Sequence, residues 1–321
     1  MYVLGIDGGG TRTTAVVADE FGNVYMHAVA GRSNPNTLTQ EAFEEVLRSL
    51  LVDLKKQNDD VFRQLSLCYA GIAGVGESGR DEEVVTLLRK GLPPQTVVTV
   101  QNDAWNALYA GTLGKPGIVQ IAGTGAITLG VNEEGKEARV GGWGYLFDDE
   151  GSGFYLGKHA LKAIFRAYDG RGPETSLSNR FCKHFQIAHV PTIISKVYGN
   201  EHPRSVIAPL ANIVVEEAQQ GDAVALAITN EACKEMVHAI HTCHRTLFAN
   251  NHATNIVLSG GVFSEGPFFI EKFRALSKVS LPSVTFELTK VPPVGGAVLA
   301  AFASEGIQVA EDFSARFNEQ L

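Results

Sequence analysis

Three consecutive glycines near the start of the sequence have the chemistry of a phosphate-binding turn. Gly8 to Gly10 lie between two apolar runs and are followed by Thr11 and Arg12. Residues without a Cβ allow backbone N–H groups to converge on an anion at close range. No lysine follows, which excludes a P-loop, and a β-branched run continues from residue 13 where a dinucleotide fingerprint needs a helix. We predict a β-hairpin that binds phosphate; the alternative is an unusually flexible turn.

Two further glycine sites occur in the C-terminal half of the sequence. Residues 118–142 repeat the first plan, with a strand, a Gly-Thr-Gly turn at 123–125, a β-branched strand, an acidic turn and a third strand. Two such meanders, about 115 residues apart, indicate an internal duplication. Gly260 and Gly261 follow a buried strand expected over residues 256–259, where bare backbone could lie against an adenine or a ribose.

Asp103 is the first candidate for chemistry outside the glycine turns. It ends the apolar segment VVTVQND and precedes a helix expected from Ala104. Residues that follow the carboxyl ends of strands in α/β sheets commonly carry the chemistry. The alternative is that Asp103 caps the following helix, which is a common role of aspartate.

The segment GGWGYLFDDEGSG has the composition of a sugar-binding loop. Trp143 between Gly142 and Gly144 offers a flat apolar face with little steric cover. Asp149 and Glu150 offer acceptors for vicinal hydroxyls. The alternative is a core tryptophan followed by two solvated acids at the start of a helix.

Helices and strands alternate after each predicted meander, and they would position these residues. The pattern predicts a helix, a buried strand, a second helix and a strand followed by a helix, over residues 40–57, 64–74, 81–92 and 96–111. Such alternation is typical of α/β layers around a mixed sheet.

A cluster of glycine and proline at residues 111–117 marks the domain boundary. We therefore predict an N-terminal domain over residues 1–115 and a C-terminal domain over residues 116–321. Gly295 and Gly296 begin an alanine-rich helix, and we expect these small residues to allow close helix packing at a hinge between the domains.

Composition excludes several classes of protein. The chain has 321 residues and a net charge of -8, without a basic run, so we expect no nucleic-acid surface. The apolar run at residues 1–6 is too short for a signal peptide, and no window reaches the roughly 18 apolar residues that span a bilayer. We expect a cytoplasmic protein that does not bind membranes. Its four scattered cysteines are expected to be reduced.

Seven motifs occur in an order that resembles the actin, Hsp70 and sugar-kinase superfamily: GIDGGGTRT, VQNDAWNAL, IAGTGAIT, GGWG, DDEGSG, LSGGVF and GGAVLAA. Within it, the sequence is most similar to the BadF/BcrA-type ATPase family, in its N-acetylglucosamine kinase branch. The resemblance covers nearly the whole chain. It implies two duplicated ribonuclease H-like (actin-like ATPase) domains of the α/β class, with a nucleotide cleft between them. It also implies that ATP and Mg²⁺ are used to phosphorylate an amino sugar, N-acetylglucosamine at its 6-hydroxyl being favoured, and we expect a homodimer.

The resemblance also implies roles for individual residues. Asp103 would accept the proton of the attacking sugar hydroxyl, and Asp7 would hold Mg²⁺ through water. The nucleotide would be bound by Gly9, Gly10, Thr11, Arg12, Gly123, Thr124, Gly125, Gly260 and Gly261. The sugar would be bound by Asp103, Gly142, Trp143, Gly144, Asp149 and one asparagine, either Asn34 or Asn36, because Pro35 makes the alignment ambiguous.

Several alternatives stay open at this point. The same family includes ATPase activators that bridge an iron–sulfur cluster between two subunits, and some relatives of the fold are sugar sensors without activity. N-acetylglucosamine, glucosamine and N-acetylmuramic acid are not distinguished by the sequence. His238, His241 and His244 are spaced by three residues, and we interpret them as a polar stripe on a packed helix in preference to a metal site.

Overall fold

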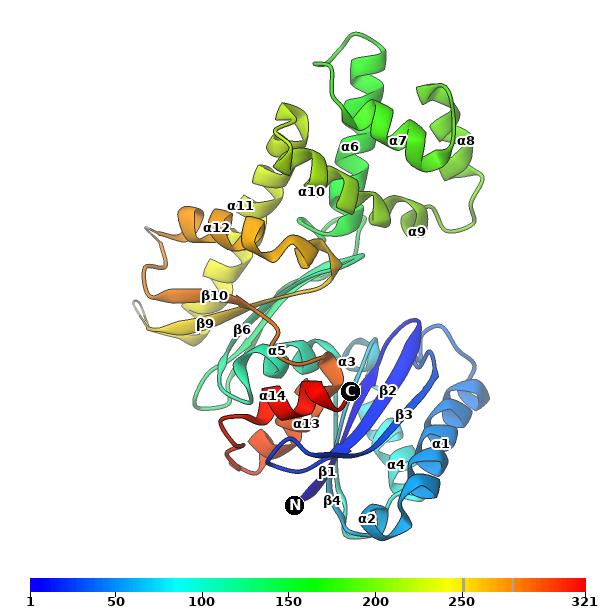
Figure 1. Ribbon diagram of the computed structural model, residues 1–321, viewed down its shortest axis with the longest axis vertical. Helices are drawn as coiled ribbons and strands as arrows, with labels where there is room; N and C mark the ends of the chain where they lie inside the picture. The colour runs from blue at the N-terminus through cyan, green and yellow to red at the C-terminus, as the bar shows by residue number, and fades with distance from the viewer. Residues whose placement is uncertain (250–251, 279) are drawn as a thin grey trace. The chain divides into compact units, whose positions relative to one another are not determined.

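The computed structural model in Figure 1 describes residues 1–249, 252–278 and 280–321. The chain forms two compact units: unit 1 comprises Met1–Pro116 and Thr289–Leu321, and unit 2 comprises Gly117–Leu288. Each unit contains one mixed five-stranded sheet with helices. Within the described residues, no helix combines the length and the apolar character that a membrane span requires.

The sheet of unit 1 has the strand order β3-β2-β1-β4-β5. Its strands are β1 (Tyr2–Gly8), β2 (Arg12–Ala18), β3 (Val24–Gly31), β4 (Leu65–Ile72) and β5 (Val97–Gln101). The first three strands form an antiparallel meander, whereas β4 and β5 run parallel to β1. The predicted N-terminal meander is thus confirmed.

The helices of unit 1 are α1 (Gln40–Gln57), α2 (Asp59–Arg63), α3 (Val75–Ser78), α4 (Asp81–Gly91), α5 (Ala104–Thr112), α13 (Pro293–Ser304) and α14 (Phe313–Glu319). α1 begins where Thr39 accepts a hydrogen bond from the N–H of Ala42 at 3.3 Å, a typical N-cap. Its apolar stripe packs with α4 and with Leu4 and Ile6 of β1 in one buried core.

The opposite face of the unit 1 sheet is covered by α13, which corrects the predicted domain boundary. The prediction assigned residues 116–321 to the second domain, but Thr289–Leu321 belong to unit 1. A Cβ on Gly5 would lie 2.7 Å from Val298 of α13, and one on Gly296 would lie 1.8 Å from the carbonyl oxygen of Asn106 on α5. The small residues of α13 therefore allow close packing, as expected, but that packing is inside unit 1.

The sheet of unit 2 repeats that of unit 1, with the strand order β10-β9-β6-β7-β8. Its strands are β6 (Gly117–Ala122), β7 (Ala126–Val131), β8 (Glu137–Gly141), β9 (Thr254–Ser259) and β10 (Val284–Leu288). Strands β6 to β8 form a second antiparallel meander, and β9 runs parallel to β6 and β10. The matching strand order supports the predicted duplication.

The helices of unit 2 are α6 (Gly153–Tyr168), α7 (Leu177–Phe185), α8 (Ile193–Tyr198), α9 (Pro203–Ile207), α10 (Ala211–Gln219), α11 (Ala223–Leu247) and α12 (Gly266–Ser277), with 3₁₀ turns η1 (Val190–Thr192), η2 (Ala208–Leu210) and η3 (Gly261–Glu265). α11 packs against the meander of this unit, and its buried face joins the sheet core. α7 and α8 lie away from the sheet in Figure 1 and share a separate apolar core with α6 and α10.

Candidate active site

Two of the predicted carboxylates lie at one edge of the unit 1 sheet. β1, β4 and β5 are parallel neighbours, so their carboxyl ends meet at the same edge. Asp7 is the last residue but one of β1, and Asp103 follows the end of β5 by two residues. Residues about 100 positions apart in the sequence are thereby brought to one edge.

The first glycine turn connects β1 to β2 at this edge. The N–H of Gly9 donates to the carbonyl oxygen of Arg12 at 3.0 Å, which leaves Gly10 and Thr11 at the tip of the hairpin. No described atom lies within 4 Å of the place that a Cβ on Gly10 would occupy. Thr11 and Arg12 are exposed. The tip is therefore accessible to a ligand, as a phosphate-binding turn requires.

Asp7 is held by a buried asparagine of α5. Asn106 Nδ2 donates to Asp7 Oδ1 at 2.8 Å and also lies near the carbonyl oxygens of Ile6 and Gly71. Burial raises the pKa of Asp7, against the Asn106 hydrogen bond and the Arg12 charge, which both lower it. A nearby cation would stabilise the ionised carboxylate. Proteins commonly hold Mg²⁺ by one or two carboxylates plus substrate phosphates, so the position fits the predicted ion.

Asp103 occupies the N-cap position of α5, yet its neighbour provides the cap. Asn102 Oδ1 accepts from the N–H of Ala104 at 3.0 Å. Within the described part of the chain, the Asp103 side chain makes no capping hydrogen bond to the helix. Asp103 is half-buried. The structure therefore does not support the alternative that the Asp103 side chain caps α5.

Asn34 and Asn36 both lie against Gly74, just after the end of β4. Asn34 Oδ1 accepts from the N–H of Asn36 at 2.9 Å, and Asn36 Nδ2 donates to the carbonyl oxygen of Gly74 at 3.2 Å. Arg80 Nη1 donates to the carbonyl oxygen of Pro35 at 3.1 Å. The loop that carries the two asparagines is therefore tethered next to the strand that neighbours β5.

The second and third glycine sites meet in unit 2. β6 and β9 are parallel neighbours and end at Ala122 and Ser259, so the turns that follow them share one edge. Gly260 has φ +107, and a Cβ there would lie 2.4 Å from the carbonyl oxygen of Ala122. Only glycine fits this backbone and this contact. The strand-to-turn segment at 259–261 therefore packs against the base of the hairpin at 123–125.

The second hairpin is supported by Asp149, which is 4 % exposed. Asp149 Oδ1 accepts from the N–H of Ala126 at 3.2 Å, and Oδ2 accepts from Arg204 Nη2 at 2.9 Å. The N–H of Gly153, at the start of α6, donates to the carbonyl oxygen of Gly123 at 2.7 Å. The hairpin is therefore held by a buried carboxylate and by the first residue of a helix.

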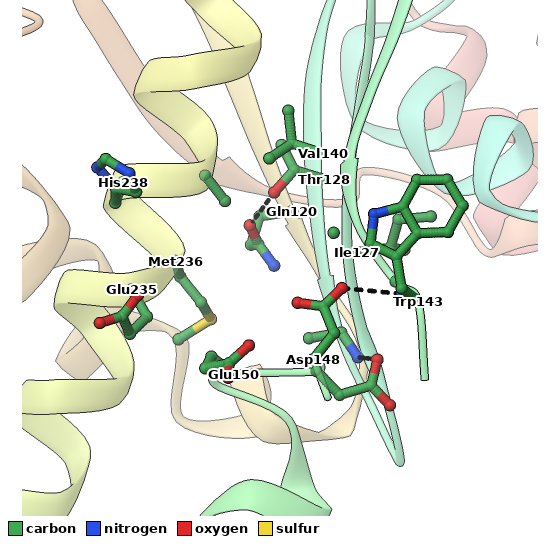
Figure 2. Close-up of a pocket in the computed structure, with 15 residues that line it drawn as sticks. Gln120, Ile127, Thr128, Val140, Trp143, Asp148, Glu150, Glu235, Met236 and His238 are labelled. Carbon is green, nitrogen blue, oxygen red and sulfur yellow. Dashed lines mark hydrogen bonds between the residues drawn. The ribbon is translucent and has the colours of Figure 1, made fainter. Parts of the chain in front are cut away.

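A cavity of about 210 Å³ adjoins these residues in unit 2 (Figure 2). Gly142, Trp143, Asp148 and Asp149 are among its lining residues. Trp143 is 65 % exposed, so the alternative of a core tryptophan is wrong. The guanidinium of Arg139 lies 4.3 Å from the centre of the Trp143 ring. The arrangement offers an aromatic surface beside hydrogen-bond acceptors, as sugar sites do.

Carboxylates from two elements face this cavity. Figure 2 shows Asp148, Glu150 and Glu235 around it, the last from α11. Burial raises the pKa of Glu150, and the neighbouring Asp148 and Glu235 raise it further. Asp148 Oδ2 also accepts from the N–H of Trp143 at 2.8 Å, which fixes the loop. Asp148 was not among the predicted site residues, although it precedes the predicted Asp149.

The three histidines of α11 differ in their surroundings. His238 lines the cavity, whereas His244 is 3 % exposed and its Nε2 lies 3.4 Å from the carbonyl oxygen of His252. Burial lowers the pKa of His244. They therefore do not form a uniform polar stripe.

Residues 4–301 match a single protein family along nearly the whole chain. The chain belongs to the BadF/BadG/BcrA/BcrD ATPase family. Membership implies the use of ATP, which agrees with two glycine hairpins on duplicated sheets.

Two similar proteins that cover nearly the whole chain are named as kinases. An N-acetylmuramic acid/N-acetylglucosamine kinase of Clostridium acetobutylicum is 30 % identical over 300 residues, covering 94 % of this chain and 98 % of that protein. An N-acetyl-D-glucosamine kinase of Dictyostelium discoideum is 30 % identical over 315 residues, with the same coverage. A solved structure of a putative N-acetylglucosamine kinase from Chromobacterium violaceum has a TM-score of 0.67 at 22 % identity, covering 94 % of this chain and 98 % of that chain. At that identity the likeness establishes the fold.

Besides Asp148, three residues of the candidate site were not predicted from the sequence: Asn102, Asn106 and Arg204. Asn102 could have been found, because asparagine directly before a helix is a strong capping signal. Asn106 and Arg204 carried no such signal, since their partners lie 99 and 55 residues away in the chain.

Proposed function

We propose that this member of the family is an ATP-dependent kinase that phosphorylates N-acetylglucosamine at its 6-hydroxyl. The names and coverage of the 30 %-identical relatives support an amino-sugar substrate. The observation that carries the proposal is the pair of carboxylates, Asp7 and Asp103, at one sheet edge of unit 1. One carboxylate suits a metal and the other a hydroxyl, as phosphoryl transfer to an alcohol requires.

In this proposal, Asp103 orients the 6-hydroxyl and accepts its proton. Phosphoryl transfer has a loose transition state, so positioning and charge stabilisation outweigh the strength of the base. The backbone N–H groups of the hairpins at 9–12 and 123–125 bind the phosphates, and Gly260 and Gly261 lie against the nucleoside. Mg²⁺, held by Asp7 through water, would neutralise phosphate charge when bound.

Sugar recognition is assigned to Trp143 with its flanking Gly142 and Gly144, to Asp149, and to one of the two asparagines. The exposed indole beside the cavity supports stacking on the sugar ring. Because the Asn36 amide nitrogen is bound to a carbonyl oxygen and Asn34 Oδ1 accepts a backbone N–H, each asparagine keeps one polar atom for a hydroxyl. We further propose that the kinase is a cytoplasmic homodimer, to be checked by light scattering.

The rival iron–sulfur activator is less well supported. Iron–sulfur clusters are held by cysteine thiolates. Burial raises the pKa of the thiols of Cys68, Cys233 and Cys243 to about 12, which opposes the thiolate form. Cys182, on α7, is half-buried. An iron signal in anaerobically purified protein would nevertheless promote this rival.

The test is a panel of about ten sugars with Mg-ATP, followed by Asp103→Asn with the preferred sugar. The substitution keeps the shape but removes the acceptor charge, so turnover should fall by at least about a hundredfold while sugar affinity changes little. Asp53→Asn, on the exposed surface of α1, is the matched control and should retain wild-type turnover. Near-wild-type turnover of a folded Asp103→Asn variant would refute the assignment, and ADP release that no sugar stimulates would refute the kinase.

A further inference from the structure

Asp149 combines a left-handed backbone conformation with a buried carboxylate. It is one of three non-glycine residues with a positive φ in the described chain, at +71°. Its side chain is also almost fully buried while carrying a carboxylate. Left-handed backbone and buried charge both oppose folding unless the surroundings compensate. Such strain commonly occurs where a site requires a fixed geometry.

The compensation comes from Arg204, on the short helix α9. Its Nη2 pairs with Asp149 Oδ2 at 2.9 Å, and its guanidinium lies 4.9 Å from the centre of the Tyr145 ring. Arg204 Nε is buried and has no hydrogen-bond partner among the described residues. The guanidinium is thus held by one carboxylate and one aromatic face, a combination that lysine cannot reproduce.

Both residues that Arg204 contacts also contact the second glycine hairpin or its neighbours. Asp149 accepts a hydrogen bond from the N–H of Ala126, and a Cβ on Gly125 would lie 2.8 Å from Arg204 Nη2 itself. Tyr145 packs edge-on against Phe154, with ring centres 5.1 Å apart. The N–H of Phe154 in turn donates to the carbonyl oxygen of Thr124 at 3.4 Å.

We propose that Arg204 is a positioning residue that fixes the second glycine hairpin in its phosphate-binding geometry by clamping Asp149. The proposal rests on the assignment of residues 123–125 to the phosphates of ATP, but not on the identity of the sugar. A hairpin that must be ordered by the ligand binds it more weakly than one that is ordered beforehand. Loss of the clamp should therefore weaken nucleotide binding even when no sugar is present.

The experiment measures ADP affinity by calorimetry with Mg²⁺ and without sugar. Arg204→Met should weaken ADP binding by about tenfold, because the hairpin loses its preorganisation, and Arg204→Lys should lie between it and the wild type. Arg180→Met is the matched control, since Arg180 pairs with Glu216 and Glu217 outside the hairpin. We expect wild-type ADP affinity for that variant.

A second variant covers the case in which Arg204→Met fails to fold because the buried Asp149 carboxylate loses its ion pair with Arg204. Arg204→Met with Asp149→Asn removes that charge and should bind ADP no more strongly than Arg204→Met alone, as residues acting through one contact are not additive. ADP affinity within about twofold of wild type in a folded Arg204→Met or double variant would overturn the inference. An equal loss in Arg180→Met would overturn it too. Failure of the sugar panel with wild-type protein would instead count against the kinase and leave this result standing.

Discussion

The two units close the far ends of their meanders in the same way. In unit 1, Asp19 Oδ1 accepts from the backbone N–H groups two and four residues later, at 3.0 Å each. In unit 2, Asn132 Oδ1 makes the same two contacts, at 3.2 and 2.8 Å. Gly22 and Gly135 take a positive φ at the same place in each turn, +84° and +74°. The duplication is therefore visible down to individual hydrogen bonds.

The glycine hairpins at the other end of the meanders are supported differently. In unit 1, the carbonyl oxygens of Gly8 and Gly9 accept from the N–H groups of Ala73 and Ser33, so neighbouring backbone holds the turn. In unit 2, backbone N–H groups of α6 likewise bind the carbonyl oxygens of Gly123 and Thr124, but the side chains of Asp149 and Arg204 add an ion pair to the support of the turn.

The far turns serve only the fold, whereas the glycine hairpins are also proposed to bind ligands. A far turn has only to reverse the chain, and an Asx turn does so with either aspartate or asparagine, so both copies keep it. Both hairpins are proposed to bind phosphates, but unit 1 also carries the Asp7 carboxylate, proposed to hold Mg²⁺, beside its hairpin. We expect the two hairpins to differ in energy as they differ in structure.

The largest effect is expected for Asp7→Asn in unit 1. Turnover should fall by at least about a hundredfold, because the variant lacks the charge proposed to hold Mg²⁺. Since burial raises the pKa of Asp7, ionisation costs folding free energy above the folded pKa, and that cost disappears below the unfolded pKa. The variant should therefore be at least as stable as wild type at neutral pH. Thermal melts with and without Mg-ADP would compare the stability of Asp7→Asn with that of wild type. A loss of stability without ligand would argue that Asp7 serves the fold.

A pair of valine substitutions distinguishes the two hairpins. Gly10→Val meets open space, so its melting temperature should stay near wild type while the KM for ATP rises by about tenfold or more. Gly125→Val would place its Cβ 2.8 Å from Arg204 and 2.9 Å from Asp149, and should cost about 1–3 kcal/mol of stability. Equal melting temperatures, or a destabilised Gly10→Val with unchanged nucleotide affinity, would contradict the difference.

The smallest effect concerns the shared far turns. Burial opposes ionisation of Asp19, but hydrogen bonds from Asn23, Tyr25 and Phe21 outweigh it and lower its pKa. That stabilisation is present above the unfolded pKa and is lost as pH falls through the folded pKa. Asp19→Asn should therefore cost about 1 kcal/mol at pH 7, and the difference from wild type should shrink below about pH 4.

Asn132→Ala in unit 2 serves as the control for this measurement by urea unfolding. It removes the two acceptor contacts and also the hydrogen bond from Asn132 Nδ2 to the carbonyl oxygen of Leu247, none of which involves an ionisable group, so its cost should be equal at both pH values. A pH-independent cost for Asp19→Asn would show that its charge contributes nothing to the turn.

Much of the local structure could be predicted because it depends on neighbours in sequence. The helix predicted over residues 40–57 is α1 with the same bounds, and both meanders follow their β-branched runs and glycine turns. The helix predicted over residues 81–92 ends one residue earlier, as α4. The edge positions of Asp7 and Asp103 were also predictable, since Asp7 lies near the end of β1 and Asp103 follows β5, and parallel pairing aligns these strand ends.

What the sequence determined by itself were the strands, helices and turns, and the presence of two similar halves, because periodicity and turn chemistry are local. The tertiary structure alone decided that Thr289–Leu321 return to unit 1, that Asn106 binds Asp7, and that Arg204 clamps Asp149. Each of these depends on a contact between distant residues whose types are common elsewhere. The return of Thr289–Leu321 to unit 1 depends on close packing at Gly5 and Gly296. The Arg204–Asp149 pair depends on burial of a charge that needs a partner.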